Sequence, residues 1–323
     1  MHPPGIRCVR VKNWEHNQKG EADDRYAGAA QPATTWELPQ RGPIVFFELD
    51  QFTIGMTAPS ILGTAISIFL GFRTNSAYDR WFQGRTYWGE IGAASVNLSL
   101  ICARVNEGYK NRKTGKESKL AAIVMPRMIK RGVAYMWVLS RQLKDLPPLE
   151  HEGLDALLDP SEIEGLESVR NPALKLLFNQ ERDFHLAAEE GQFLDGEHFE
   201  FVAIQRELTT LMTKCFSLKN TGFPTHYTYF TDLFVWLLVI LLSMSLPGQE
   251  NLGYFAVPIA VLIGWIFSMI EGIGDYMDYP WINNRNVIPT NYLNRSHEID
   301  ILALGLAETD LPQMVVEKDG ALY

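Results

Sequence analysis

The chain has 323 residues, of which 46% are hydrophobic, and its mean hydropathy of −0.08 is close to neutral. Its formal net charge of −9 excludes a typical nucleic-acid-binding protein, because such a protein needs a basic surface to contact phosphates. The three cysteines are far apart in sequence and form no CxxC pair, so the sequence indicates neither a disulfide framework nor a cysteine-based zinc site. A protein buried in the membrane throughout would be more apolar, so any membrane part must accompany a large water-exposed part.

The two ends of the chain carry little structural signal. Within residues 1–50 the apolar run Ile44–Phe47 is only four residues long, so we expect a poorly ordered N-terminal tail. Residues 51–302 are predicted to form one domain. Residues 303–323 lack strong periodicity and are predicted to form a C-terminal tail.

The first long apolar segment, residues 51–72, has 22 residues without a formal charge. A helix needs roughly 20 apolar residues to cross the hydrocarbon core of a bilayer, so we predict a membrane span here. Small residues recur at every fourth position and share one helical stripe, which favours close helix packing through Gly63, Ser67 and Gly71. Pro59 lies inside the segment and is expected to kink or break the helix.

A neighbouring stripe of the same segment contains Ser60, Thr64, Ile68 and Phe72. These side chains can pack against other helices of the same subunit. Alternatively, several copies of the helix can surround a central axis, where a ring of Ile68 and Phe72 would form a hydrophobic constriction that gates ions by dewetting. Spacing alone favours packing within the subunit.

The segment that follows is basic and rich in aromatic residues. From Arg73 to Arg131 there are twelve Lys and Arg but only four Asp and Glu, and this bias predicts that residues 73–232 are cytoplasmic. Arg73, Arg80 and Arg85 would then lie near the cytoplasmic mouth of a pore and favour anions. They can equally bind lipid head groups or buried carboxylates, and the aromatic residues among them are typical of a membrane interface.

Residues 73–232 have the pattern of a set of helices. Leu120–Leu143 has apolar residues at three- and four-residue spacing, and a Pro-Pro pair follows it. Asp159-Pro160 is a typical helix start, and Glu197–Lys214 is a further amphipathic run.

Two more apolar segments lie close together near the C-terminus. Residues 233–249 and 251–270 contain 17 and 20 residues without a charge, and the Pro247-Gly248 pair between them indicates a turn. We predict an antiparallel pair of spans, and hence a multi-pass membrane protein with about three spans. The alternative is that all three segments are buried helices of a soluble protein.

Motifs of common enzyme classes are missing from the sequence. It contains no HExxH, GxSxG, GxxxxGK[ST] or GxGxxG pattern. Glu181 and His185 are one helical turn apart, but this spacing also arises by chance. The sequence therefore predicts that the protein is not an enzyme.

Several motifs resemble the signature of the bestrophin-like family, especially its prokaryotic-type branch. They cover about residues 50–302 and are Ile68-Phe69-Leu70-Gly71-Phe72-Arg73-Thr74-Asn75-Ser76-Ala77-Tyr78-Asp79-Arg80-Trp81, then Gly84-Arg85 and Trp88-Gly89, Lys219-Asn220-Thr221-Gly222-Phe223-Pro224, Phe234-Val235-Trp236, and Asn286, Pro289, Arg295, Glu298, Ile299 and Asp300. The resemblance implies an all-α homopentamer around a central pore, which conducts small ions, chiefly chloride, across a lipid membrane. It places the apolar neck of the pore at Thr64, Ile68 and Phe72 and thereby favours the pore interpretation of that stripe.

The sequence also departs from the family pattern. The family has an apolar span before residues 51–72, and none is found in residues 1–50. Calcium-gated animal members bind calcium through an acidic loop, of which Asp275 and Asp278 are the nearby acids here; the pattern is thinned, so we expect no cofactor and leave calcium open. Besides an anion channel, a cation-permeable channel and a non-conducting membrane scaffold stay open.

Overall fold

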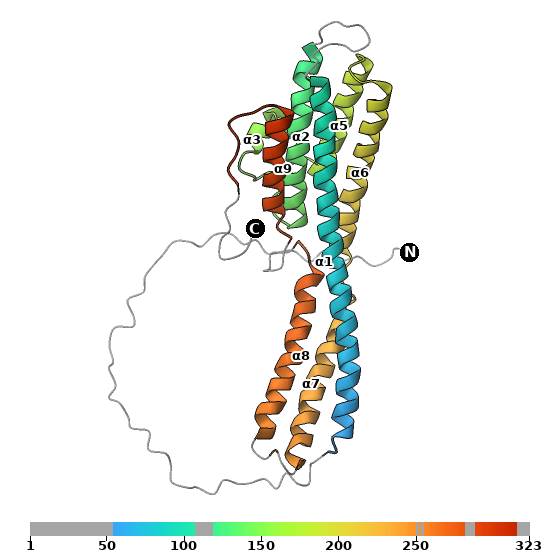
Figure 1. Ribbon diagram of the computed structural model, residues 1–323, viewed down its shortest axis with the longest axis vertical. Coiled ribbons are helices and arrows are strands. Elements are labelled where there is room, and N and C mark those ends of the chain that lie inside the picture. Colours follow the sequence, from blue (N-terminus) through green and yellow to red (C-terminus); the bar gives the residue numbers. More distant parts are fainter. Residues whose placement is uncertain (1–53, 107–118, 250–251, 253–254, 282–287, 315–323) are drawn as a thin grey trace, which may run out of the picture. The chain divides into compact units, whose positions relative to one another are not determined.

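The computed structural model describes residues 54–106, 119–249, 252, 255–281 and 288–314 of the chain (Figure 1). Regular structure in these ranges is helical, which confirms the predicted all-α class. The predicted N-terminal tail and most of the predicted C-terminal tail lie outside the described residues. The helices are α1 (Thr57–Asn106), α2 (Lys119–Leu143), α3 (Leu154–Leu157), α4 (Pro160–Glu167), α5 (Pro172–Glu189), α6 (Asp195–Asn220), α7 (Thr225–Ser245), α8 (Ala256–Asp278) and α9 (Thr290–Gly305).

Helix α1 is the element that connects the whole described region. Its 50 residues run without a break, a length of about 75 Å at 1.5 Å per residue. The expected kink at Pro59 is wrong. Pro59 is the third residue of α1, in the first turn, where a backbone N–H has no helical partner and a missing one costs nothing.

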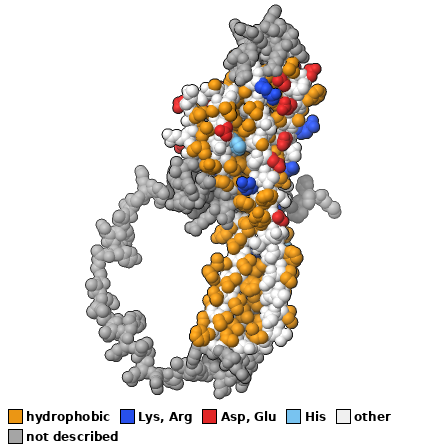
Figure 2. All heavy atoms as spheres, in the orientation of Figure 1, with side chains coloured by type: hydrophobic (Ala, Val, Ile, Leu, Met, Phe, Trp, Pro, Cys, Tyr) orange, Lys and Arg blue, Asp and Glu red, His pale blue; other side chains and the backbone are white. Residues whose placement is uncertain are grey.

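The first part of α1 packs with α7 and α8 into a three-helix group, which we call the apolar bundle (Figure 1). Its small core includes Ile66 and Leu70 of α1, Leu238 of α7 and Ala260 of α8. Most of its apolar surface faces outward, because only 28% of the 18-residue apolar stretch of α7 and 22% of that of α8 are buried. Figure 2 shows the hydrophobic side chains that cover these helices.

Two helices in the described part are long and apolar enough to cross a membrane, α7 from His226 to Ser245 and α8. The prediction of about three spans is therefore corrected to two candidate spans among the described residues. The uncharged helical part of α1 extends only from Thr57 to Phe72 and is about 24 Å long, less than the roughly 30 Å of a hydrocarbon core. Its Ser, Thr and Gly residues also lower its hydropathy.

The predicted turn between the last two apolar segments is confirmed as a 3₁₀ turn at Leu246–Gly248. The helix bounds differ from the predicted ones. α7 begins at Thr225, eight residues before the predicted span, and α8 continues eight residues beyond Ile270, to Asp278. The extension of α7 contains Asp232, and that of α8 contains Glu271, Asp275 and Asp278. The predicted spans ended at these residues because a span was defined as a stretch without formal charge.

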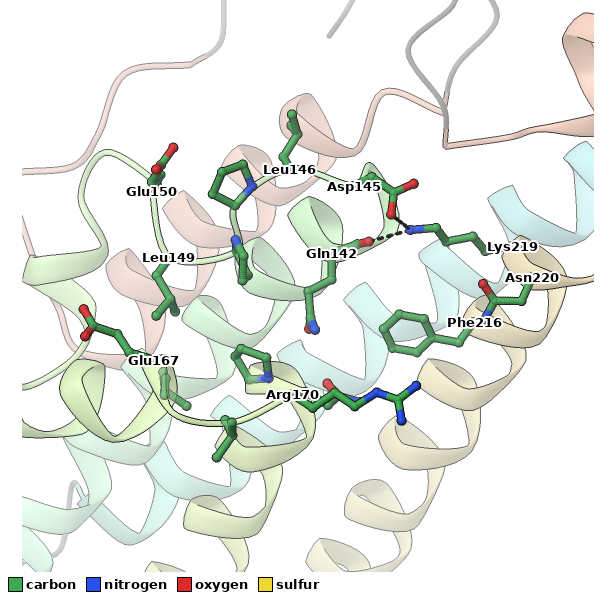
Figure 3. A pocket seen from close by; sticks show the side chains of 16 residues that line it. Gln142, Asp145, Leu146, Leu149, Glu150, Glu167, Arg170, Phe216, Lys219 and Asn220 are labelled. Atoms are coloured by element: carbon green, nitrogen blue, oxygen red, sulfur yellow. Dashed lines mark hydrogen bonds and ion pairs between the residues drawn. The ribbon is translucent and has the colours of Figure 1, made fainter. Parts of the chain in front are cut away.

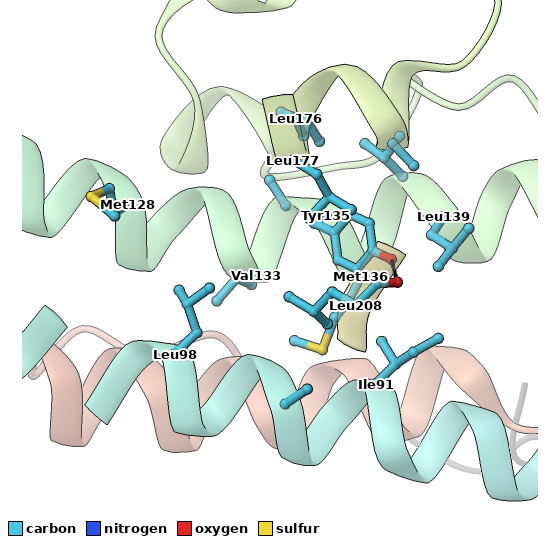
Figure 4. Packing of buried hydrophobic residues seen from close by; sticks show 14 of the residues in the cluster. Ile91, Leu98, Met128, Val133, Tyr135, Met136, Leu139, Leu176, Leu177 and Leu208 are labelled. Atoms are coloured by element: carbon cyan, nitrogen blue, oxygen red, sulfur yellow. Dashed lines mark hydrogen bonds between the residues drawn. The ribbon is translucent and has the colours of Figure 1, made fainter. Parts of the chain in front are cut away.

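The second part of α1 packs with α2, α6 and α9, and α2 also packs with α5; with the short helices α3 and α4 they form what we call the polar bundle. Its core is large and apolar, and Figure 4 shows Ile91 and Leu98 of α1 facing side chains of α2. Tyr135 of α2 is buried there and donates its hydroxyl proton to the carbonyl of Leu208 at 3.2 Å.

Local sequence signals explain where helices of the polar bundle begin and end. The predicted start at Asp159-Pro160 is confirmed, with Pro160 in the first turn of α4. α5 ends at a Schellman motif: Gly191 has a φ of 76°, and the N–H of Gln192 bonds to the carbonyl of Ala187 at 3.0 Å. The predicted helical runs near Leu120–Leu143 and Glu197–Lys214 are confirmed as α2 and α6.

Candidate functional site

The stripe Thr64, Ile68 and Phe72 lies on a face of α1 that no described helix covers. Ile68 is 55% exposed and Phe72 is 68% exposed, while Ile66 and Leu70 on the opposite side are buried. Thr64 is exposed too, and its hydroxyl donates to the carbonyl of Ser60 at 2.8 Å, so its polar group is satisfied within the helix. The packing interpretation of this stripe therefore finds no partner within the described part of the subunit.

The predicted small-residue stripe divides between two environments. Gly63 lies against α7, because a Cβ at this position would be 3.6 Å from Leu238. Ser67 and Gly71 are exposed, and the Ser67 hydroxyl donates to the carbonyl of Gly63 at 2.8 Å. Contact between copies through Ser67 and Gly71 stays a prediction.

Arg73 lies on the buried side of α1 and joins it to α8 and α7. Its side chain is 4% exposed; Nη1 donates to Glu271 Oε1 at 3.0 Å, and Nη2 bonds to Asp275 and, at 3.3 Å, to the hydroxyl of Thr228. A charge in a membrane segment is costly unless it is paired in the protein interior, and these partners meet that need. Glu271 is absent from the sequence predictions because its partner is 198 residues away.

Arg80 repeats the arrangement two helical turns later. Its Nε lies 2.6 Å from Asp278 Oδ1, and its Nη2 donates to the carbonyl of Leu218 at 2.9 Å. The structure thus pairs two of the predicted mouth arginines with Asp275 and Asp278, the two aspartates for which calcium binding was left open. Arg85 differs from both, since its side chain is exposed.

These ion pairs occupy the acidic groups that we considered for calcium. Asp278 also accepts a hydrogen bond from the backbone N–H of Phe223 at 3.2 Å. Over the described ranges, no group of three or more His, Cys, Asp or Glu residues is arranged to hold a metal ion. A calcium role for Asp275 and Asp278 stays a prediction.

A second buried charge network lies in the polar bundle. Arg131 of α2, 3% exposed, makes two bonds to Glu162 of α4, at 2.7 and 3.0 Å, and one to Asp183 of α5 at 2.9 Å. Burial is the largest influence on the pKa of Arg131 and lowers it, but the hydrogen bonds and charges of Glu162 and Asp183 together raise that pKa above its ordinary value. The network holds three helices together with the arginine charged.

A cleft of about 1060 Å³ lies between the α2–α3 connection, the α4–α5 connection and the end of α6 (Figure 3). Lys219 and Asp145 form an ion pair of 2.5 Å at its edge, and Arg170 and Phe216 also line it. Its charges are of both signs and its walls are partly proline and leucine. This arrangement does not resemble an acid–base or nucleophilic site.

The two buried cysteines and the His185–Glu181 pair are not activated. Burial raises the pKa of the Cys102 and Cys215 thiols to about 12, which keeps both protonated and unreactive at neutral pH. His185 and Glu181 form an exposed pair at 3.3 Å. Among the described residues these groups supply no activated nucleophile.

The fold combines an apolar bundle that exposes its hydrophobic surface with a polar bundle that buries its own, and this combination is typical of a membrane protein. Comparison with known proteins gives the family. The profile of the family described as "Bacterial/Fungal Bestrophin protein" matches residues 44–303, and the chain belongs to this family.

Relatives of known name are distant but cover most of the chain. The chain is 24% identical over 253 residues to the "Voltage-dependent anion channel-forming protein YneE" of Salmonella typhi, across 78% of this chain and 77% of that protein. It is 26% identical over 254 residues to the "Voltage-dependent anion channel-forming protein alr2987" of Nostoc sp., across 75% and 74%. The crystal structure of a bacterial bestrophin homologue from Klebsiella pneumoniae has the same fold, with a TM-score of 0.69, 23% identity, and coverage of 78% of this chain and 88% of that chain.

Proposed function

We propose that this protein is the subunit of a homo-oligomeric ion channel, a pentamer by its resemblance to the family, that conducts chloride and other small anions across a membrane. The ions pass along the exposed face of α1, and Thr64, Ile68 and Phe72 of each copy form the constriction. The anion assignment is supported by the names of the relatives, which are called voltage-dependent anion channel-forming proteins.

One observation carries the proposal: large apolar side chains of α1 remain uncovered next to two helices that are long and apolar enough to span a membrane. Ile68 and Phe72 are more than half exposed, although Leu70 between them is 2% exposed. α7 and α8 already cover the opposite side of α1. A common axis surrounded by copies of α1 would cover Ile68 and Phe72 and produce a narrow apolar ring, which opposes the passage of ions when it loses water.

The pairing of Arg73 with Glu271 supports the constriction indirectly. The pair fixes α1 against α8 directly after Phe72, so the rotation of α1 around its own axis is set by a buried contact. Ile68 and Phe72 are therefore held on the uncovered side. Such fixed orientation is what a ring of identical side chains requires.

The test is the current of purified protein reconstituted into planar lipid bilayers under a salt gradient. We expect the reversal potential to have the sign of the chloride equilibrium potential. We also expect a several-fold change in current for Phe72→Ala and Ile68→Ala, because a smaller side chain widens and wets the constriction. Val261→Ala is the matched control, since Val261 is a similarly exposed apolar residue, 63% exposed, that belongs to α8 and not to α1.

Two results would contradict the proposal in different ways. Stable oligomers that pass no current would favour a membrane scaffold. Currents that Val261→Ala alters as much as Phe72→Ala does would show that ions do not pass along the uncovered face of α1.

A further inference from the structure

The exposed face of α1 does not stop at the constriction but follows the helix to its end. One line of positions along α1 runs from Thr57 to Arg104 in steps of three or four residues, and each of its positions is exposed or half-exposed: 57, 61, 64, 68, 72, 75, 79, 82, 86, 90, 93, 97, 100 and 104. The opposite side of the same helix is buried in both bundles, for example at Leu70 and Ile91. We call this continuous uncovered side the open face of α1.

Helix geometry places two acidic residues on the open face. At about 100° per residue in an unbroken helix, Asp79 is rotated by about 20° and Glu90 by about 40° from Ile68 around the axis of α1. Both side chains are exposed. Asp79 lies about 16 Å and Glu90 about 33 Å along the helix from Ile68.

The predicted mouth arginines lie elsewhere. Arg73 and Arg80 are rotated by about 120–140° from Ile68, and both are held in ion pairs with α8. Their positive charge is therefore compensated inside the subunit and is not presented to the open face. Arg104, at the far end of the open face, lies 3.6 Å from Glu200.

The two acids lack such compensation within the subunit. Asp79 accepts a 3.3 Å hydrogen bond from the Asn75 side chain, one turn earlier on the open face. Across the described ranges neither Asp79 nor Glu90 forms an ion pair. Their negative charge is thus free to act on whatever lies in front of this face.

We infer that Asp79 and Glu90, repeated in every copy, form two acidic rings along the ion pathway beyond the constriction, and that these rings reduce the channel's preference for anions. This inference rests on the proposed function, since it requires copies of α1 around one axis. A ring of like charges between protein walls concentrates cations and repels anions. Permeant anions must pass both rings, so the rings limit anion selectivity.

The experiment compares Asp79→Asn, Glu90→Gln and the double variant with the unmodified protein in the same bilayers. Both substitutions keep the side-chain shape and remove the charge. We expect the anion-to-cation permeability ratio, obtained from the reversal potential under a potassium chloride gradient, to rise by at least about threefold in the double variant. Glu164→Gln is the matched control, because Glu164 is an exposed acid of α4 away from the open face, and its ratio should not change.

The outcomes separate the two proposals. Unmodified protein that conducts, with a permeability ratio that neither substitution changes, overturns the inference and leaves the proposed function intact. Unmodified protein that passes no current overturns both. If the substitutions instead dissociate the oligomer, as size-exclusion chromatography in detergent would show, the acids pair with a neighbouring copy, for example with its Arg85, and the inference is wrong.

Discussion

The apolar and polar bundles use opposite arrangements of the same residue types. In the polar bundle large side chains are inside: Trp88, Tyr135 and Phe184 are at most 2% exposed. In the apolar bundle Trp236 is 68% exposed and Trp265 is 59% exposed. The difference shows that the two bundles suit different solvents, because exposed apolar surface is unfavourable in water but not in lipid.

Charged residues show the second half of the contrast. Arg73 in the apolar bundle and Arg131 in the polar bundle are almost equally buried, and each is paired with two carboxylates. The polar bundle nevertheless exposes many other charges, whereas α7 and α8 carry no charged side chain between Leu233 and Ser245 or between Ala256 and Ile270. Helix α1 takes part in both bundles, which is possible because its buried and open faces keep the same direction over 50 residues.

The largest effect is expected at Arg131. In Arg131→Met, Glu162, which is 8% exposed, loses its cation, and Asp183, which is 2% exposed, keeps only its ion pair with Arg127. An uncompensated buried charge such as that of Glu162 costs about 3–5 kcal/mol. Thermal unfolding in detergent should show a large loss of stability, with unfolding confined at first to the polar bundle.

The control for this change is Arg206→Met, since Arg206 is an exposed arginine of the same bundle. Its melting temperature should match that of the unmodified protein. Equal melting temperatures for Arg131→Met and Arg206→Met would mean that the buried network does not stabilise the polar bundle.

A pair of leucines compares the two bundles directly. Leu139 is 0% exposed in the polar bundle and Leu238 is 2% exposed in the apolar bundle. Leu139→Ala should cost about 2–5 kcal/mol, the usual value for a leucine in a core that is surrounded by water. Leu238→Ala should cost less, because lipid chains are as apolar as leucine and only the packing contribution is lost.

The measurement is thermal unfolding of both variants in lipid nanodiscs, with Leu237→Ala as the control. Leu237 is 42% exposed next to Leu238, and its substitution should have little effect. An equal loss for Leu139→Ala and Leu238→Ala would contradict the view that different solvents stabilise the two bundles.

The smallest effect concerns pH and belongs to the polar bundle alone. His151 stacks on Trp137 with ring centroids 3.8 Å apart, and burial, followed by the charges of Arg295 and Arg141, lowers the pKa of His151 from 6.5 to about 4. Between these pH values the unfolded chain binds a proton that the folded chain does not. Stability should therefore fall as the pH decreases from about 6.5 to 4, by about 1–3 kcal/mol in total.

His151→Phe keeps the stacking and removes the titration, so its melting temperature should depend less on pH than that of the unmodified protein. Burial raises the pKa of the nearby Glu298, which acts in the opposite direction on stability, but Glu298 is present in both proteins. Identical pH dependence in the two proteins would rule out His151 as the source.

Much of the local structure could be predicted from the sequence. The hairpin of α7 and α8, the starts of helices such as α4, and the stripe of Thr64, Ile68 and Phe72 follow from patterns that repeat every three or four residues. The resemblance to the family could also be recognised, because its longest motif, Ile68–Trp81, is one continuous run of residues. These features depend on neighbours within one or two helical turns.

Only the tertiary structure decided which charged side chains of α1 are paired inside the subunit and which remain on its open face. The sequence left open whether Arg73 and Arg80 line a pore mouth, contact lipid or pair with buried carboxylates. In the structure they pair with carboxylates about 200 residues away on α8, and the acids Asp79 and Glu90 remain on the open face. Helical periodicity states which residues share a face, yet it does not state which face another helix will cover. Long-range packing and the need to pair every buried charge determine which face is covered. These long-range contacts cannot be predicted from the local sequence pattern.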